Sequence, residues 1–112
     1  MLAKVNRASS AEILFVLQKG RLINGFLFSV LVFNLGDSRP PRFAFVISSK
    51  ICKRAVERNR LKRLLRESLK PLLQRISLGT IVLFLGKKKL VGKESEFISI
   101  EVNKVFKKGQ LI

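Results

Sequence analysis

The stretch from residue 50 to residue 73 constrains the fold of this chain more than any other, because it carries two superposed patterns. The first is apolar: leucines recur at steps of three and four residues, as on the buried side of an α-helix. These residues are Leu61, Leu64, Leu65, Leu69, Leu72 and Leu73. The spacing predicts a helix that begins near Lys53 or Ala55 and docks on a core. Pro71 lacks an N–H, so the helix should end or kink by about Leu69, or Pro71 could open a short second helix.

The second pattern in this stretch is cationic. Its basic residues are Lys50, Lys53, Arg54, Arg58, Arg60, Lys62, Arg63, Arg66 and Lys70. At roughly 100° per residue, the side opposite the leucines carries Asn59, Lys62, Arg63, Arg66 and Lys70. Helix faces that only contact solvent usually carry both basic and acidic residues, whereas Glu57 and Glu67 are the only acidic residues in this stretch. Arginine donates bidentately to phosphate oxygens, so the pattern favours a nucleic-acid interface over a solvated face.

Composition narrows the class of protein. The chain has 112 residues, enough for one domain, and 47% hydrophobic content with nine Phe favours a folded core. Its net charge of +16 points to a polyanionic partner, which could be RNA, DNA or an anionic membrane surface. The membrane alternative would need an exposed apolar face, and the leucine face is needed for the core. The single Cys52 cannot form an internal disulfide, which fits a reducing cytoplasm.

The rest of the chain predicts an α/β order. Residues 1–8 read as a flexible basic arm. Ser9 and Glu12 form a capping-box pattern for a helix over residues 10–19, and Gly20 stands where a left-handed C-cap belongs. Two strands are predicted over residues 25–34 and 42–48, antiparallel to each other, with a turn or loop at 35–41. An apolar strand buried on both faces is predicted at 80–85, and a helix at 95–108, although its alternating apolar residues also suit a strand.

The residue inventory contains no site for covalent or metal chemistry. The chain has no His, one Cys and seven carboxylates, so no metal cage and no nucleophile–base pair is expected. Glu57 and Glu67 lie on the cationic helix, where they are expected to be partners for Arg. Lys87, Lys88 and Lys89 form a second basic cluster after the last strand. The inventory is typical of a protein that binds and positions.

Residues 42–66 resemble the signature of the bacterial ribonuclease P protein subunit. The run Arg58-Asn59-Arg60 is followed by Lys62-Arg63 and Arg66 at the family spacing, and a strand and a short basic linker precede it. The match covers about a quarter of the chain. The chain departs from the family pattern where Ser49 replaces the first Lys of a pair, where Ala44 replaces a glycine, and at the aromatic positions of the first helix, which are Ile13 or Leu14, and Leu17 here.

The resemblance implies a fold, an activity and a set of contacts. The fold would be an α/β sandwich like domain 2 of ribosomal protein S5, in the order helix, strands, basic helix, strand and helix, with a left-handed βαβ crossover. The protein would be a cytoplasmic subunit of the endoribonuclease that removes the 5′ leader from precursor tRNA. The RNA subunit would perform the hydrolysis with Mg²⁺, bound by the RNA and the RNA–protein interface. Neither a membrane nor a small-molecule substrate would be a partner.

The implied RNA contacts fall into three groups. Contacts to the ribonuclease P RNA would come from Lys50, Lys53, Arg54, Arg58, Asn59, Arg60, Lys62, Arg63 and Arg66. A cleft between the first helix and the sheet would hold the single-stranded leader, with Phe15, Leu17, Phe26 and Phe28 as candidates. Lys87, Lys88 and Lys89 would add basic contacts. The alternative is a non-catalytic RNA-binding protein of the ribosomal S5 type, from which the spacing around Arg58-Asn59-Arg60 separates this chain.

Overall fold

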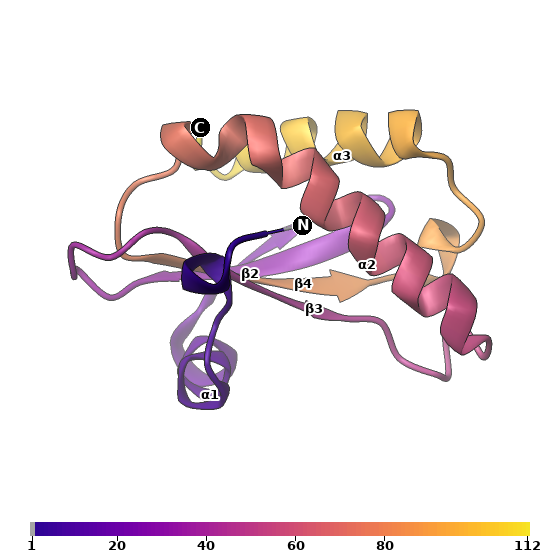
Figure 1. Cartoon of the computed structure of the whole chain (residues 1–112), viewed down its shortest axis with the longest axis horizontal. Helices are drawn as coiled ribbons and strands as arrows, with labels where there is room; N and C mark the ends of the chain where they lie inside the picture. Colours follow the sequence, from indigo (N-terminus) through magenta and orange to yellow (C-terminus); the bar gives the residue numbers. More distant parts are fainter. Residues whose placement is uncertain (1) are drawn as a thin grey trace.

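In the computed structural model of the chain, which describes residues 2–112, two long helices cover one face of a four-stranded sheet (Figure 1). The helices are α1 (Ser10–Lys19), α2 (Ala55–Leu69) and α3 (Ser95–Lys108), and the strands are β1 (Arg21–Asn24), β2 (Phe28–Asn34), β3 (Arg42–Val46) and β4 (Thr80–Gly86). Short 3₁₀ helices are η1 (Lys4–Asn6), η2 (Lys70–Arg75) and η3 (Lys88–Leu90). Helices α2 and α3 lie side by side above the sheet, and α1 lies below one end of it.

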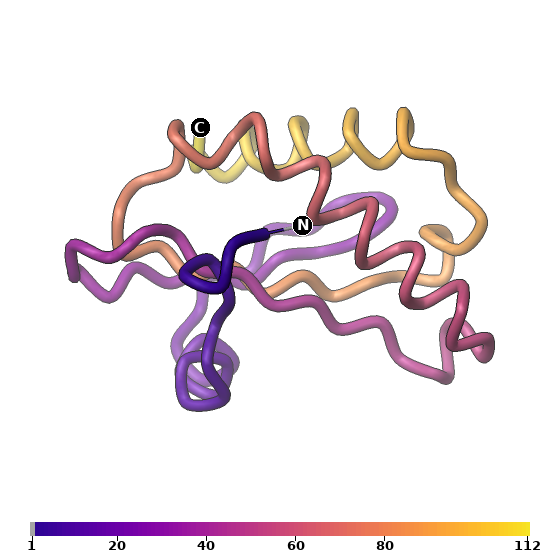
Figure 2. Tube along the Cα trace, viewed as in Figure 1, coloured from indigo at the N-terminus to yellow at the C-terminus, as the bar shows by residue number. Residues whose placement is uncertain are grey.

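The strand order is β1-β2-β4-β3. The pairs β1–β2 and β2–β4 are antiparallel, while β3 and β4 run parallel and are joined through α2, as the tube in Figure 2 makes clear. The strands predicted at 25–34 and 42–48 do run antiparallel to each other, as β2 and β3, but they are not hydrogen-bonded neighbours because β4 lies between them. β4 takes the central position since its apolar run can be buried on both faces, as predicted.

Only residues 28–34 of the strand predicted at 25–34 form a strand, β2, and residues 25–27 form a tight turn that joins β2 to β1. The carboxylate of Glu101, a buried residue on α3, accepts hydrogen bonds from the backbone N–H groups of Phe26 and Leu27. Gly25 sits so close to α3 that an added Cβ would lie 2.6 Å from Glu101 Oε2 and 2.7 Å from Val105 Cγ2. This long-range contact turns the chain at Gly25 and makes room for β1, which the sequence analysis missed.

The core has two unequal parts. On the α2–α3 side, the leucines of α2 meet Phe28 and Phe84 of the sheet and Phe106 of α3, and all of these lie in one buried cluster. Four of the predicted leucines, Leu61, Leu64, Leu65 and Leu69, are buried on α2, and Leu72 is buried on η2. On the opposite face, Val16 of α1 packs on Ile81 and Leu83 of β4. Only α1 covers this face, and much of the sheet beyond it has no helix over it (Figure 1), so the second cluster stays small.

The ends of the helices follow the sequence with one exception. Ser9 and Glu12 form the predicted capping box. Helix α2 ends at Leu69, and Pro71 lies in the first turn of η2, so Pro71 opens a short second helix, which was one of the two alternatives predicted. Helix α3 spans the predicted residues and Gly109 follows it. Gly20 is the exception: its φ of −69° is extended backbone, not left-handed. A glycine is needed there because α1 and Leu31 leave no room for a side chain.

The segment before α1 lies against the sheet. Residues 2–8, predicted as part of a flexible arm over 1–8, dock beside β3, while residue 1 lies outside the described part of the chain. The Asn6 side chain donates to the Pro41 carbonyl at 2.8 Å, and the Ala8 N–H donates to the Phe43 carbonyl at 3.0 Å. Leu2 is buried in the main cluster. The bridge between Arg7 and Phe43 holds this basic residue of the arm beside β3.

Candidate nucleic-acid interface

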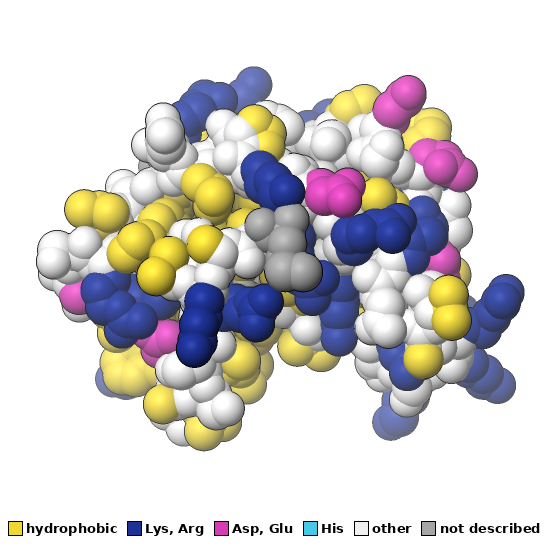
Figure 3. All heavy atoms as spheres, viewed as in Figure 1, with side chains coloured by type: hydrophobic (Ala, Val, Ile, Leu, Met, Phe, Trp, Pro, Cys, Tyr) yellow, Lys and Arg dark blue, Asp and Glu magenta, His cyan; other side chains and the backbone are white. Residues whose placement is uncertain are grey.

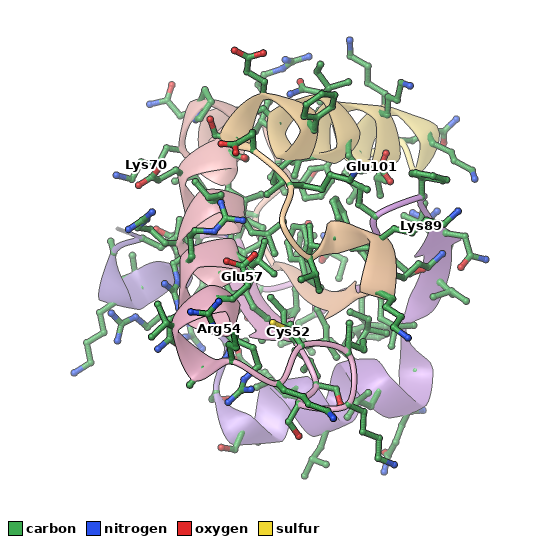
Figure 4. All side chains as sticks on the ribbon, turned by 90° about the vertical axis from the view of Figure 1, so that its right-hand side faces the viewer. Cys52, Arg54, Glu57, Lys70, Lys89 and Glu101 are labelled. Carbon is green, nitrogen blue, oxygen red and sulfur yellow. The ribbon has the colours of Figure 1, made fainter. Side chains whose placement is uncertain are left out.

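The Arg58-Asn59-Arg60 run lies near the start of α2, which begins at Ala55, and its two arginines are bonded within the protein. Arg58 donates from Nη1 to the carbonyls of Cys52 (2.8 Å) and Lys53 (3.0 Å), so it fixes the linker that enters α2. Figure 4 shows Arg54 and Cys52 side by side near the lower end of α2, with Cys52 to the right. The free thiol of Cys52 is buried. Asn59 is exposed.

Arg60 ties α2 to the loop before α3. Its Nε and Nη2 donate to the two carboxylate oxygens of Glu57 at 2.7 and 2.8 Å, and Nη2 also donates to the Lys93 carbonyl at 3.0 Å. Glu57 further accepts from the Gly92 N–H at 2.9 Å. The Arg60 guanidinium, helped by this N–H, lowers the pKa of Glu57 to about 2 against the opposing effect of burial. The expectation that Glu57 is a partner for Arg is confirmed.

The remaining cations, together with the uncharged Asn59, form a row along the outer side of α2 and the start of η2, which we call the α2 row. Its members are Asn59, Lys62, Arg63, Arg66 and Lys70. Within residues 2–112, Lys62, Arg66 and Lys70 form no ion pair with a carboxylate. Arg63 lies 3.9 Å from Glu67, and both side chains are more than half exposed, so the pair is weak. Lysine and arginine side chains outnumber acidic ones on this face of the molecule (Figure 3).

A groove runs between the α2 row and the edge strand β3. It has a volume of about 380 Å³ and is lined by Leu2, Arg7, Ala8, Phe43, Ala44, Phe45, Lys62 and Arg66. The Arg66 guanidinium carbon lies 5.4 Å from the centre of the Phe45 ring, which is partly buried. The groove thus combines cations with an aromatic side chain, and both phosphate groups and bases are stabilised by such surroundings.

The four candidates for the leader cleft do not lie together. Phe28 is fully buried in the main core, 5.2 Å from the Phe84 ring, so it cannot contact RNA and this prediction is wrong. Phe15 is partly exposed on α1, with its ring 4.9 Å from that of Phe33. Phe26 lies on the turn held by α3, on the other side of the sheet from α1. Leu17 is half exposed on α1.

Helix geometry separates Leu17 from Phe15 as well. Two residues turn a helix by about 200°, so the two side chains leave opposite sides of α1. Phe15 points to Phe33, which pairs with Ile81 at the start of β4. Leu17 therefore points along the sheet toward the end of β4, where no described helix covers this face (Figure 1).

We call this uncovered part the open sheet face. The register places one row of its side chains across the strands, namely Asn24, Ser29, Leu85 and Val46. The neighbouring row contains Leu31, Leu83 and Ala44, which pack in the cluster around Val16 of α1, and Leu22 at its β1 end is left open. Leu22 and Val46 are about half exposed although they are large and apolar. Neither residue is among the site residues predicted from the sequence. Leu22 alternates with Ile23, and Val46 with Phe45, so that the two residues of each pair point to opposite faces of the sheet. This alternation does not indicate which of the two faces is exposed to solvent.

The other predicted contacts are spread along the molecule. Lys50, Lys53 and Arg54 are exposed in the linker before α2. Lys88 and Lys89 are exposed on η3, whereas Lys87 donates from Nζ to the Gly25 carbonyl at 2.6 Å and so holds the β1–β2 turn. The linker cations continue the α2 row, but Lys87, Lys88 and Lys89 belong to a different edge of the molecule.

Two further observations concern metals and membranes. Among residues 2–112, no three His, Cys, Asp or Glu side chains cluster so that they could hold a metal ion. No helix in the same range is both long and apolar enough to cross a membrane.

Comparison with known proteins gives one consistent answer. The family model described as Ribonuclease P matches residues 3–110. A curated relative, the ribonuclease P protein component of Synechococcus sp. (strain JA-2-3B'a(2-13)), is 37% identical over 73 residues, which are 65% of this chain and 55% of the relative's length. The match thus spans little more than half of that relative.

Solved structures agree with the fold. A mutant RNase P protein of Staphylococcus aureus with defective mRNA degradation activity superposes with a TM-score of 0.88 at 23% identity, covering 97% of this chain and 92% of that one. The RNase P protein of Thermotoga maritima gives a TM-score of 0.79 at 22% identity, covering 91% and 96%. At these identities the superpositions establish the arrangement of helices and strands.

Proposed function

The chain belongs to the ribonuclease P protein family, and from this membership we propose that it is the protein subunit of ribonuclease P. In this role it binds the catalytic RNA subunit and the 5′ leader of precursor tRNA. It thereby assists the endonucleolytic cut that produces the mature tRNA 5′ end.

The observation that carries the proposal is the α2 row with its adjoining groove. From Asn59 to Lys70 the row is about 16 Å long at 1.5 Å per residue, and Lys62, Arg66 and Lys70 have no carboxylate partner in the described chain. Their mutual repulsion in the free protein is relieved when phosphates approach, and each neutralised phosphate releases counterions. The basic linker 50–54 extends the same surface. We assign this surface to the RNA subunit.

We assign the leader to the open sheet face beside α1. The leader is single-stranded, so its bases are free to lie on apolar side chains. Leu17 forms one wall, and Leu22, Leu85 and Val46 form the floor. Aliphatic side chains replace aromatic ones here, so each base should be held less tightly than on a stacked ring.

We assign the hydrolysis itself to the RNA subunit. Mg²⁺ held by the RNA, and at the RNA–protein interface, would supply the chemistry of the cut. In the protein, the carboxylate of Glu57 is bonded to Arg60 and the Gly92 N–H, and that of Glu101 to two backbone N–H groups. These groups position the protein, while its exposed cations bind RNA.

Two finer points belong to the same proposal. The parallel β3–β4 pair joined through α2 supports a fold like domain 2 of ribosomal protein S5 with a left-handed crossover. The single free Cys52 supports a reducing, cytoplasmic site of action.

The test is precursor-tRNA cleavage by a bacterial ribonuclease P RNA at low Mg²⁺, with and without this protein. We expect the protein to stimulate cleavage at the mature 5′ end. The double variant Lys62→Ala, Arg66→Ala should lose most of the stimulation and bind the RNA subunit with a shallower salt dependence, by about two charges. Lys107→Ala, on the exposed side of α3, is the matched control. Tight RNA binding by the wild type without stimulation would refute the proposal.

A further inference from the structure

The β1–β2 turn is held by side chains from outside the hairpin. Glu101, a buried residue of α3, accepts from the N–H groups of Phe26 and Leu27. Lys87 donates to the Gly25 carbonyl at 2.6 Å, and Lys108 donates to the Asn24 carbonyl at 3.1 Å. The turn therefore has its backbone polar groups bonded on both sides, and its conformation is fixed before any ligand arrives.

This fixed turn presents an aromatic ring to solvent. Phe26 is 60% exposed, although a phenyl ring of this size is usually placed in a core. The Lys89 ammonium lies 4.1 Å from the ring centre and covers part of it. Figure 4 shows Lys89 and Glu101 converging on this corner of the molecule from η3 and α3.

A depression next to the ring is lined with further cations. Its volume is about 410 Å³, and its lining residues are Asn24, Gly25, Phe26, Glu101, Lys104, Val105 and Lys108. The carboxylate in this set is occupied by the two backbone N–H groups, so the groups left facing outward are the ring and the ammonium groups. Gly25 allows the turn to lie close to α3, since a Cβ there would collide with Glu101 and Val105.

We propose that Phe26 is a stacking platform for one unpaired nucleotide of single-stranded RNA, whose phosphates are held by Lys89, Lys104 and Lys108. A base can stack on a ring whatever its identity, and flanking cations bind the backbone on either side of it. The fixed turn lowers the entropy lost on binding, because the ring does not have to be ordered by the ligand. The site lies on the α3 side of the sheet edge, apart from the α2 row and from the open sheet face.

The proposal rests on the proposed function for the source of the RNA. The nucleotide comes either from the RNA subunit or from precursor tRNA, and the two share the chemistry of an unpaired base with its phosphates. We expect the site to bind single-stranded RNA in the isolated protein, so it can be tested with an oligonucleotide in the absence of the RNA subunit.

The chain has no Trp and no Tyr, so one introduced Trp can report on the site alone. We would compare Phe26→Trp with Phe97→Trp. Phe97 is 58% exposed and has the Lys93 ammonium 5.8 Å from its ring centre, but two acidic residues, Glu94 and Glu96, shortly precede it in the chain. Each variant is titrated with a single-stranded oligouridylate, with the ribonuclease P RNA alone, and with precursor tRNA added to the preassembled holoenzyme. Anionic phospholipid vesicles serve as a further ligand.

The expected result is quenching of the Phe26→Trp fluorescence by the oligonucleotide and by one of the two natural RNAs, with Phe97→Trp unchanged. Quenching by the RNA subunit alone identifies that subunit as the source, and quenching only when precursor tRNA is added identifies the substrate. Phe26→Leu should weaken oligonucleotide binding at least about fivefold, while Phe97→Leu should not.

Equal responses of the two Trp variants, or quenching by vesicles and not by RNA, would overturn the proposal. If the wild type fails to stimulate cleavage but the oligonucleotide still quenches Phe26→Trp, the proposed function fails and the nucleotide site stands. If the wild type stimulates cleavage and no RNA quenches Phe26→Trp, the nucleotide site fails and the function stands.

Discussion

Arg42 connects α1 to the loop before β3 through a buried ion-pair cluster. Its side chain has no exposed surface, and Nη1 donates to Glu12 Oε2 at 2.6 Å. Nη2 donates to both carboxylate oxygens of Asp37 at 3.0 Å. We predict that Arg42→Met destabilises the fold, because it leaves two partly buried carboxylates without their partner.

The magnitude follows from two opposing terms. Breaking a buried ion pair by removing one partner costs about 3–5 kcal/mol. The Nε of Arg42 has no hydrogen-bond partner in the described chain, and removing this unsatisfied donor returns about 1 kcal/mol. The net loss should be about 2–4 kcal/mol, a large part of the stability of a domain of this size.

Urea denaturation followed by far-UV circular dichroism measures this loss, since the chain has neither Trp nor Tyr to report by fluorescence. Arg39→Ala is the matched control: Arg39 lies 3.6 Å from the same Glu12 carboxylate but is 61% exposed, so its loss should cost less than about 1 kcal/mol. Equal midpoints for the two variants would refute the reasoning, because burial would then add nothing to the value of the pair.

Three further predictions concern α2 and the β1–β2 turn. The folded-state pKa of Glu57, about 2, lies below its ordinary 4.5, so its contribution to stability is complete above about pH 4.5 and is lost as the pH falls toward 2. The stability difference between wild type and Glu57→Gln should therefore shrink over that range in urea titrations, and a constant difference would contradict the ion pair. Leu65→Ala should cost about 2–5 kcal/mol in the same assay, since Leu65 is fully buried; a loss below 1 kcal/mol would mean that α2 does not dock as described. Gly25→Ala should lower the melting temperature, because its Cβ would press on Glu101 and Val105, and an unchanged value would show that the turn can move away from α3.

The sequence predicted those parts of the fold that depend on local pattern. The leucine spacing located α2, the Ser9–Glu12 pattern located the start of α1, and the apolar run at 80–85 identified the central strand. It failed at the β1–β2 turn, where the contact that bends the chain comes from Glu101, about 75 residues away. Strand order was likewise out of reach, because the pairing of β2 with β4 joins segments that share no local signal.

For the candidate site, the sequence placed the cations on the correct helix but could not divide their tasks. Lys62 and Arg66 line the groove as a helical repeat of four predicts. Phe28 lies in the core, whereas Phe15 is partly exposed on α1 and Phe26 is exposed on the β1–β2 turn. This separation depends on which side of each helix, strand or turn the core occupies, and the three residues look alike in the sequence. Burial decides among them, and burial is a property of the assembled sheet.

The division of tasks within Arg58-Asn59-Arg60 has a consequence for RNA binding. Residues 58 and 60 are about 200° apart around α2, so their side chains reach protein on opposite flanks. Arg58 holds the linker carbonyls and Arg60 holds the Lys93 carbonyl. These hydrogen bonds on both flanks fix the rotation of α2 about its axis, so the α2 row, which includes Asn59, faces outward. The two arginines thus orient the cations that we assign to phosphate binding, and a row oriented in advance would lose less entropy on binding RNA.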